Sequence, residues 1–236
     1  MTAMLFRDDA YLRSCDARVM HVGQDGIRLD RTVFYPNGGG QPGDTGLLRR
    51  ADGSAIEIVN TVKGPLDNDV LHIAAPGGVE LSPGETVAAE IDWARRHLHM
   101  RYHTALHLMC AAVPAPVTGG QISADKARLD FDIDMALLDK DAIEAKVNAL
   151  IEAAHPVSSR WVDEAELDAN PGLVRTMSVA PPRGQGTVRL IEVAGADLQP
   201  CGGTHVRNTA EIGRFAVQKI RSEGKQNKRV IIVLES

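Results

Sequence analysis

The chain has 236 residues, with 26 Lys and Arg against 31 Asp and Glu, so its formal net charge is −5. Hydrophobic residues make up 44% and charged residues 24%, which excludes collagen-like, disordered and coiled-coil proteins. The acidic balance argues against a general nucleic-acid coat protein. Residues 207–229 nevertheless hold seven basic and two acidic residues, a net of +5, which would suit a local contact with one RNA.

Three dispersed cysteines are too few for a disulfide scaffold and favour a reducing compartment. Charged residues at positions 7–9 interrupt the place where an export signal needs its apolar stretch. Residues 102–124 lack Asp, Glu, Lys and Arg, but histidines, prolines and glycines break the run, so we expect no membrane span. We therefore expect a cytoplasmic protein.

The first 92 residues read as short strands separated by clusters of Gly, Pro, Asp and Asn. Strands at this spacing predict a small barrel or sandwich. The expected strands cover residues 17–22, 26–29, 55–61, 70–73 and 86–91.

A long helix is expected from Trp93 to about Val113, with Asp92 as its N-cap and Pro114 ending it. We place the domain boundary at its start, which gives a β-rich domain at 1–92 and a second domain at 93–236. Five residues spaced as one helical face predict a single buried stripe. They are Leu98, Tyr102, Ala105, Met109 and Ala112.

The rest of the chain predicts one more helix and several strands. Asp139 is expected to cap a helix that runs to about His155. Long helices beside hairpin-linked strands predict an α+β domain with an antiparallel sheet. The expected strands cover residues 129–133, 157–162, 187–193, 215–221 and 229–235.

Two short motifs carry metal-binding side chains. HTALH places His103 and His107 four residues apart, on one face of the expected helix. CGGTH holds Cys201 and His205 around two glycines, which favour a loop or a helix start. Three imidazoles and one thiolate suit zinc, and the two motifs together favour a metal site.

The helix itself leaves the choice of ligands open. His99 lies four residues before His103, and Cys110 lies three residues after His107. Spacing alone therefore permits a His99–His103, a His103–His107 or a His107–Cys110 pair.

A glycine-rich segment, FYPNGGGQPGDTG, spans residues 34–46. Consecutive glycines expose backbone N–H groups and permit positive φ, so the segment could cradle a phosphate. It lacks the Lys-Ser/Thr ending of a P-loop. On these grounds an irregular connector between strands is the simpler interpretation.

HTALHLM at 103–109, CGGTH at 201–205 and the glycine-rich segment together resemble the editing domain shared by alanyl-tRNA synthetases and their free-standing relatives, the AlaX proteins. TGGQISADKARLDFD at 118–132 resembles that family's stretch between the two motifs, and residues 213–235 resemble its closing hairpin. The resemblance covers nearly the whole chain. In its layout the chain resembles the medium-length AlaX type.

This resemblance implies a small N-terminal β-barrel followed by an α+β editing domain. It implies Zn²⁺ bound by His103, His107, Cys201 and His205. It further implies hydrolysis of the ester that joins a wrong amino acid, chiefly serine and also glycine, to the 3′ end of tRNA(Ala). No membrane or DNA partner is expected.

Further site residues are expected around this centre. Gln121 and Thr204 are the catalytic candidates, since either side chain could hydrogen-bond the substrate or the attacking water. Strand alternation places Lys219 and Arg221 on one face, where they would suit an RNA acceptor stem. The full set of substrate-binding candidates is Gly38, Gly39, Gly40, Gln41, Gly202, Gly203, Lys219 and Arg221.

Two other functional classes compete with hydrolysis of a charged tRNA. HTALH lacks the Glu that follows the first His in HExxH peptidases, which argues against a zinc peptidase. A non-catalytic tRNA-binding module with a structural zinc keeps the same motifs, because four protein ligands close a tetrahedral site.

Overall fold

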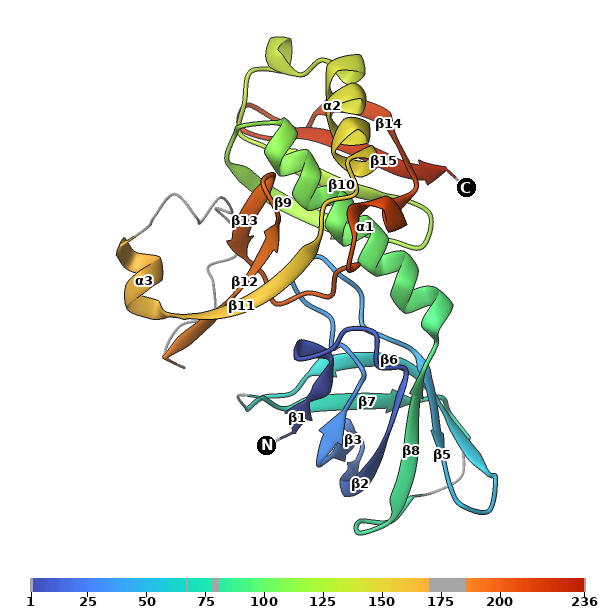
Figure 1. Cartoon of the computed structure of the whole chain (residues 1–236). Helices are drawn as coiled ribbons and strands as arrows, with labels where there is room; N and C mark the ends of the chain where they lie inside the picture. The colour runs from blue at the N-terminus through green and yellow to red at the C-terminus, as the bar shows by residue number, and fades with distance from the viewer. Residues whose placement is uncertain (1, 67, 78–80, 170–185, 236) are drawn as a thin grey trace. The chain divides into compact units, whose positions relative to one another are not determined.

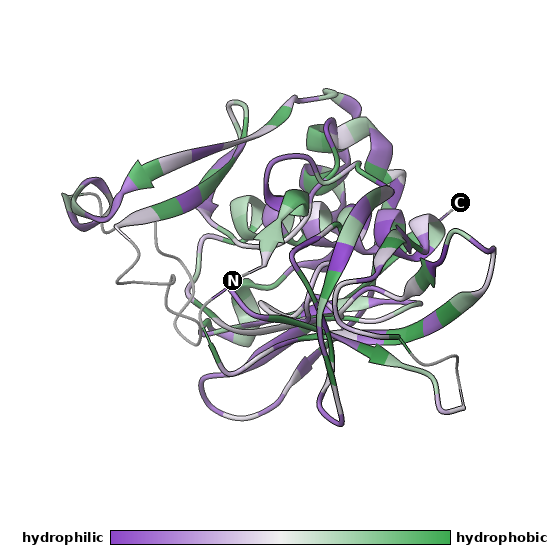
Figure 2. Cartoon of the chain, turned by 90° about the horizontal axis from the view of Figure 1, so that it is seen from below, coloured by the Kyte–Doolittle hydropathy of each residue, from purple (hydrophilic) through white to green (hydrophobic). Residues whose placement is uncertain are grey.

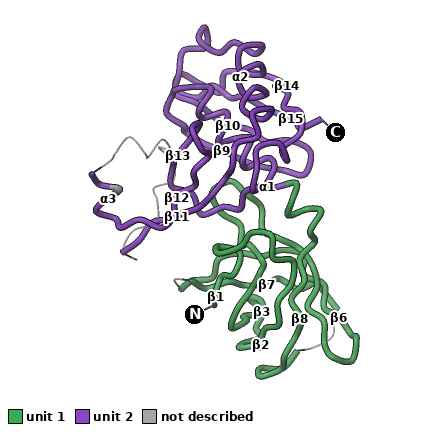
Figure 3. Tube along the Cα trace, viewed as in Figure 1, with its two compact units in different colours: residues 1–98 green, residues 99–236 purple. Residues whose placement is uncertain are grey.

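The computed structural model describes residues 2–66, 68–77, 81–169 and 186–235 and contains both helices and strands, with strands in the majority (Figure 1). It divides into two compact units, residues 1–98 and 99–236 (Figure 3). The division falls within helix α1, Trp93–Ala112. Within the described residues, no helix is both long and apolar enough to cross a membrane.

The first unit contains a closed barrel of six strands in the order β2-β3-β7-β6-β5-β8. The same unit also contains a short parallel pair of strands, β1 (Ala3–Met4) and β4 (Arg31–Thr32). A 3₁₀ turn at Leu5–Arg7 directly follows β1 in the chain. The barrel strands are Ser14–Gly23 (β2), Gly26–Leu29 (β3), Gly46–Arg49 (β5), Ala55–Lys63 (β6), Val70–Ala74 (β7) and Thr86–Ile91 (β8).

The barrel closes on alternating apolar residues. In β8 every second side chain is buried, namely Val87, Ala89 and Ile91, and β6 buries Ile56 and Ile58 in the same way. Figure 2 shows hydrophobic and hydrophilic residues alternating along strands. Burial of these apolar side chains is the main term that stabilises the barrel. The expected strands at 26–29 and 86–91 match β3 and β8, whereas the short β5 was not expected.

In its described residues the second unit holds two antiparallel sheets and the larger part of α1. One sheet has the strand order β14-β15-β10-β9 and the other β11-β12-β13. Its strands are Val117–Ile122 (β9), Ala127–Phe131 (β10), Val157–Asp163 (β11), Thr187–Val193 (β12), Asp197–Pro200 (β13), Arg214–Ser222 (β14) and Lys228–Glu235 (β15). Of these, β9 and β13 were not expected from the sequence.

The helices differ in length, and the expectation of several long ones is not confirmed. Helix α1 has 20 residues, α2 (Lys140–Glu152) has 13 and α3 (Glu164–Ala169) has 6. Short 3₁₀ turns lie at Met135–Leu137 and Thr209–Ile212. Both predicted N-caps are present, since Asp92 accepts from Arg95 N–H at 3.1 Å and Asp139 from Ala142 N–H at 3.0 Å.

Burial of α1 is wider around the helix than the predicted stripe but shorter along it, since Leu98 and Ala112 are only half-buried. Every residue from Tyr102 to Cys110 is buried, so the helix is enclosed on all its faces over two turns. His103, Thr104 and His107 are among these buried residues. Burial of a polar group lowers the stability of the fold unless the group is hydrogen-bonded. The partners of these three side chains therefore indicate the role of this segment.

Candidate metal centre

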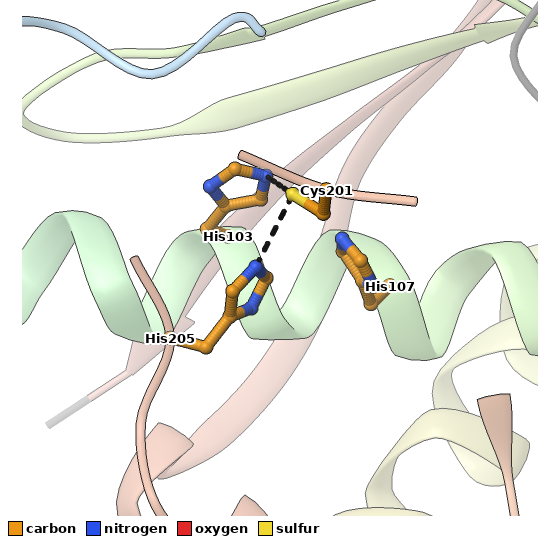
Figure 4. Close-up of side chains that lie close together, drawn as sticks. All are labelled: His103, His107, Cys201 and His205. Atoms are coloured by element: carbon orange, nitrogen blue, oxygen red, sulfur yellow. Dashed lines mark hydrogen bonds between the residues drawn. The ribbon is translucent and has the colours of Figure 1, made fainter. Parts of the chain in front are cut away.

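Four side chains from two separate parts of the chain converge in the second unit (Figure 4). His103 and His107 extend from helix α1, while Cys201 and His205 lie on the segment that follows β13. One ligand atom from each of the four lies within 4.8 Å of the other three. The Sγ atom of Cys201 is 3.4 Å from Nε2 of His103 and 3.4 Å from Nε2 of His205.

These distances agree with a tetrahedral zinc site. Zn–S bonds of about 2.3 Å and Zn–N bonds of about 2.0–2.1 Å place sulfur and nitrogen ligands about 3.6 Å apart in a tetrahedron. The donor set of three imidazoles and one thiolate is also one that zinc prefers. The residues present therefore fit a zinc ion.

Thr104 orients His205. Its hydroxyl donates to the Met100 carbonyl at 3.0 Å, so the same oxygen accepts at 3.1 Å from Nδ1 of His205. The Val206 N–H also donates to this oxygen, at 3.3 Å. With its proton on Nδ1, His205 directs the lone pair of Nε2 toward Cys201 and the centre.

Asp197 orients His107 in the same manner. Oδ2 of Asp197 lies 3.1 Å from Nδ1 of His107 and accepts its proton, which leaves Nε2 as the ligand atom. The side-chain amide of Gln199 donates to the same Oδ2 at 2.7 Å. Asp197 and Gln199 alternate along β13, so one face of this short strand supports the ligand from α1.

Arg189 holds the ligand segment in place. Its guanidinium donates to the carbonyls of Cys201 and Gly203, at 3.1 and 2.8 Å. The Cys201 N–H donates back to the Arg189 carbonyl, and the Gly203 N–H points to Sγ of Cys201 at 3.4 Å. These hydrogen bonds fix the backbone around the Cys201 sulfur.

The charges of the centre favour a thiolate. Burial alone would raise the pKa of Cys201, but the charges of His103 and His205 hold that pKa well below its usual range. Burial lowers the pKa of His107, yet Asp197 and the Cys201 sulfur outweigh this effect and raise it to about 9. The pKa of His205 falls well below its usual value, because of burial and the two neighbouring histidines.

Neither of the rival ligands on α1 belongs to the cluster. Among the described residues the cluster consists of His103, His107, Cys201 and His205, and it omits His99 and Cys110. Both omitted side chains are buried elsewhere along the helix. The geometry thus selects one of the three pairs that spacing permitted.

The two catalytic candidates occupy different surroundings. Thr204 is fully buried between two ligands. Gln121 is exposed on β9, where its Oε1 accepts from Nε and Nη2 of Arg128 at 3.3 and 3.2 Å. In the ligand segment Gly202 is exposed and Gly203 is buried.

The glycine-rich segment contains a tight turn in the first unit. Gly38 and Gln41 exchange two backbone hydrogen bonds of 3.0 Å, and the residues between them, Gly39 and Gly40, have φ of +56° and +80°. Such a turn needs positive φ at both central positions, which glycine provides. Residues 33–45 otherwise lie outside helices and strands, between β4 and β5, as expected for an irregular connector, and residues 38–41 form a tight turn within it.

The base of this segment is tied down by a buried ion pair. Asp44 accepts the Tyr35 N–H at 2.6 Å and pairs with Arg96, whose side chain is fully buried. Arg96 also donates to the Val33 carbonyl at 2.6 Å and to Ala10 at 3.0 Å. Removal of one partner from such a pair leaves a buried charge unpaired, so the segment is firmly anchored.

The basic hairpin carries less free charge than its sequence suggests. Lys219 and Arg221 are both exposed on β14, after a bulge at Val217–Lys219. Arg221 pairs with Glu223 at 2.6 Å, and Arg229 pairs with Asp130 at 2.8 Å. Among the residues that the structure describes, Lys219 and the exposed Lys225 of the hairpin turn have no ionic partner.

Several supporting residues were missed in the sequence. Thr104, Arg189, Asp197 and Gln199 support the candidate ligands but do not belong to the cluster itself. The sequence gives little indication of these roles. Thr104 directly follows the predicted ligand His103, and Asp197 and Gln199 precede Cys201 at alternate positions. Such supporting partners are recognised by contacts, which the sequence does not display.

Comparison with known proteins gives relatives along the full chain. It is 37% identical over 243 residues to the alanyl-tRNA editing protein AlaX-M of Methanosarcina acetivorans, with 99% of each chain covered. It is 33% identical to AlaX-M of Saccharolobus solfataricus, with 98% of each covered. It is also 34% identical over 225 residues to an alanine–tRNA ligase of Saccharolobus islandicus, of which it spans 25%.

Two described families match parts of the chain. Residues 188–231 match the threonyl and alanyl tRNA synthetase second additional domain. Residues 7–95 match the class II (A) tRNA synthetases. The first match contains Cys201 and His205, and the second contains the glycine-rich segment.

Proposed function

Because this chain belongs to the family of the AlaX-M alanyl-tRNA editing proteins, we propose that it hydrolyses mischarged tRNA(Ala), chiefly seryl-tRNA(Ala) and also glycyl-tRNA(Ala). Water adds to the carbonyl carbon of the aminoacyl ester, the bond to the ribose oxygen breaks, and that oxygen takes a proton. The products are the free amino acid and uncharged tRNA.

One observation carries this proposal. Three buried histidines and a half-buried cysteine gather in one cluster, and Thr104 and Asp197 orient two of the rings inward. Zinc, when bound there, would supply a Lewis acid beside the ester. An aminoacyl ester is already activated, so the chain need not provide a strong covalent nucleophile.

The chain's own residues bind and orient the substrate. Arg128 engages Oε1 of Gln121, so the amide N–H groups are what Gln121 offers to a substrate carbonyl or to the attacking water. The exposed Gly202 lies beside open space, since a Cβ there would meet nothing within 4 Å, and its backbone is thus open to a substrate. Thr204, being fully buried, supports the ligand segment from within.

Selectivity follows from the serine hydroxyl. A site that hydrogen-bonds this hydroxyl leaves buried polar groups unpaired when alanine enters, and alanine is rejected. Glycine is smaller than alanine and enters without such a bond. We therefore propose seryl-tRNA(Ala) as the best substrate and glycyl-tRNA(Ala) as a weaker one.

A second function, tRNA binding around a structural zinc, has one observation in its favour. Four protein ligands fill a tetrahedral coordination sphere, and filled spheres are typical of structural sites. This alternative keeps the metal and the RNA contact but gives no deacylation.

Deacylation assays separate the two functions. Release of labelled amino acid is followed from seryl-, glycyl- and alanyl-tRNA(Ala), with and without a chelator. We expect rapid loss of serine, slower loss of glycine, near-complete sparing of alanine, and inhibition by the chelator. RNA binding with no release of serine would establish the non-catalytic module instead.

A further inference from the structure

An exposed tryptophan lies on the sheet that supports the candidate metal centre. Trp161 is on β11, which pairs with β12 in the sheet of order β11-β12-β13 (Figure 1). Trp161 is 47% exposed, although tryptophan is a residue that proteins usually bury to a large extent. The neighbouring Val162 is only 4% exposed, so the chain turns its smaller apolar residue inward and the indole outward.

The strand register places Trp161 on the face that supports the ligands. Trp161 pairs directly with Arg189 of β12, and residues directly opposite in an antiparallel pair share a face. Two residues further along β12, Ile191 pairs with Gln199 of β13, so Gln199 also shares that face. Gln199 and Arg189 are the residues that support His107 and the Cys201 segment.

Trp161 is therefore a near neighbour of the ligand segment. Directly opposite residues have Cα atoms about 4.5–5.5 Å apart, and Arg189 itself reaches the carbonyls of Cys201 and Gly203. The other face of the same sheet has its own apolar cluster, formed by Val162, Val188 and Leu190 with Leu198. The indole thus takes no part in that cluster.

We propose that Trp161 is a stacking platform for an unpaired base at the 3′ end of the charged tRNA. This inference rests on the proposed function and adds a positioning residue to it. The ester to be cleaved sits on the last nucleotide of an unpaired strand, so the bases of that strand must pass close to the centre. Aromatic side chains bind unpaired bases by stacking, and any base offers a face for it.

Stacking here serves binding more than chemistry. The indole touches a part of the substrate that does not react, so it should stabilise bound substrate and transition state alike. Loss of the indole should then raise KM and leave kcat nearly unchanged. A residue that merely supported the fold would lower the amount of active protein or the metal content instead.

Fluorescence tests the stacking without requiring catalysis. The chain has two tryptophans, Trp93 and Trp161, so Trp93→Phe leaves Trp161 as the sole indole. The probe is an RNA minihelix of the acceptor stem ending in its unpaired 3′ nucleotides, and the control RNA lacks them. We expect the first RNA to quench the Trp161 emission and the truncated RNA to leave it unchanged. Equal signals from both RNAs overturn the proposal.

Kinetics provide the second arm. On seryl-tRNA(Ala), Trp161→Ala should raise KM about tenfold, within the range of one base stack, while Trp161→Phe should restore most of the binding. Both variants are compared at equal zinc content and equal thermal stability. If the wild type deacylates seryl-tRNA(Ala) and Trp161→Ala has the same KM, the stacking role is overturned and the proposed function stands. If the wild type shows no deacylation, the proposed function is overturned. The fluorescence experiment then still shows whether Trp161 stacks on the unpaired end of the RNA.

Discussion

Thr104 and His205 are joined by a hydrogen bond that decides which nitrogen of the histidine faces the candidate metal centre. The Thr104 hydroxyl donates its hydrogen to the Met100 carbonyl, so toward Nδ1 of His205 its oxygen can only accept a hydrogen bond. Nε2, 3.4 Å from Sγ of Cys201, is then the ligand atom. A residue outside the candidate ligand set thus sets the orientation of a ring within it.

This relationship predicts a loss of metal affinity when the hydroxyl is removed. Thr104→Val keeps the shape of the side chain but cannot accept the His205 proton, and we expect zinc affinity to fall about 10–100-fold. Thr104→Ser keeps the hydroxyl and serves as the matched control. Competition with a chromophoric chelator measures both. Equal affinities for the two variants would show that the bond has no orienting role.

The ligand set predicts which substitutions remove the metal. We expect about one zinc per folded chain in the wild type, since a four-ligand site closes around one ion. Cys201→Ala and His107→Ala should lower zinc content and activity together. His99→Asn, on the same helix but outside the cluster, is the control and should keep its zinc. Full zinc content in a Cys201→Ala, His205→Ala double variant would disprove the assignment.

The basic hairpin predicts unequal effects on RNA binding. Lys219→Glu should weaken binding of tRNA(Ala) and flatten its salt dependence, since each phosphate contact adds about 0.9 to the log–log slope on a duplex. Arg221→Glu should do less, because Glu223 already neutralises Arg221 at 2.6 Å. Binding measured over a series of salt concentrations checks both. An unchanged slope in Lys219→Glu would move the phosphate contact to another surface.

The tight turn in the glycine-rich segment predicts an effect on selectivity. Replacing Gly39 and Gly40 by Val forces positive φ on branched residues, so the turn must rearrange. Gly39 and Gly40 are among the substrate-binding candidates, so the serine-to-alanine ratio of deacylation rates should fall while zinc is retained. Gly53→Val, another glycine with positive φ and open space around it, is the control for general strain. An unaltered ratio in the double variant would mean that the turn only connects strands.

A buried histidine inside the first unit predicts acid sensitivity. Burial lowers the pKa of His72 to about 4, although its hydrogen bond to the Ile27 carbonyl at 3.0 Å opposes the shift. Its Nε2 lies 2.8 Å from the Thr32 hydroxyl, an arrangement that suits a neutral ring. In the unfolded chain the ring binds a proton below about pH 6.5. The contribution to stability is therefore complete above that pH and is lost as the pH falls toward 4.

Between pH 7 and pH 5 this histidine should cost the protein about 2 kcal/mol of its free energy of unfolding. His72→Gln should show a correspondingly smaller loss over that range. His21→Gln, an exposed histidine of the same barrel, should behave as the wild type. Urea unfolding at a series of pH values measures the three curves. Parallel curves for His72→Gln and the wild type would refute the role of His72.

Local patterns were sufficient where one segment carries its own signal. Asp92 and Asp139 as N-caps, the pair His103 and His107 on one helix face, and CGGTH outside regular structure all follow from the properties of a few consecutive residues. Strands such as β3 and β8 could be predicted as well, because their alternation or their flanking turns lie within the segment itself.

Packing between distant segments decided the rest. His99, His103, His107 and Cys110 are equivalent by spacing, and only the approach of the segment after β13 selects two of them as ligands. β9, with Gly119 and Gly120, is a poor strand by composition and forms because β10 pairs with it. The orienting roles of Thr104 and Asp197 arise across about 100 and 90 residues of chain, as hydrogen bonds of 3.1 Å. Such contacts exist only once the chain is folded, because no local preference of either residue encodes its partner.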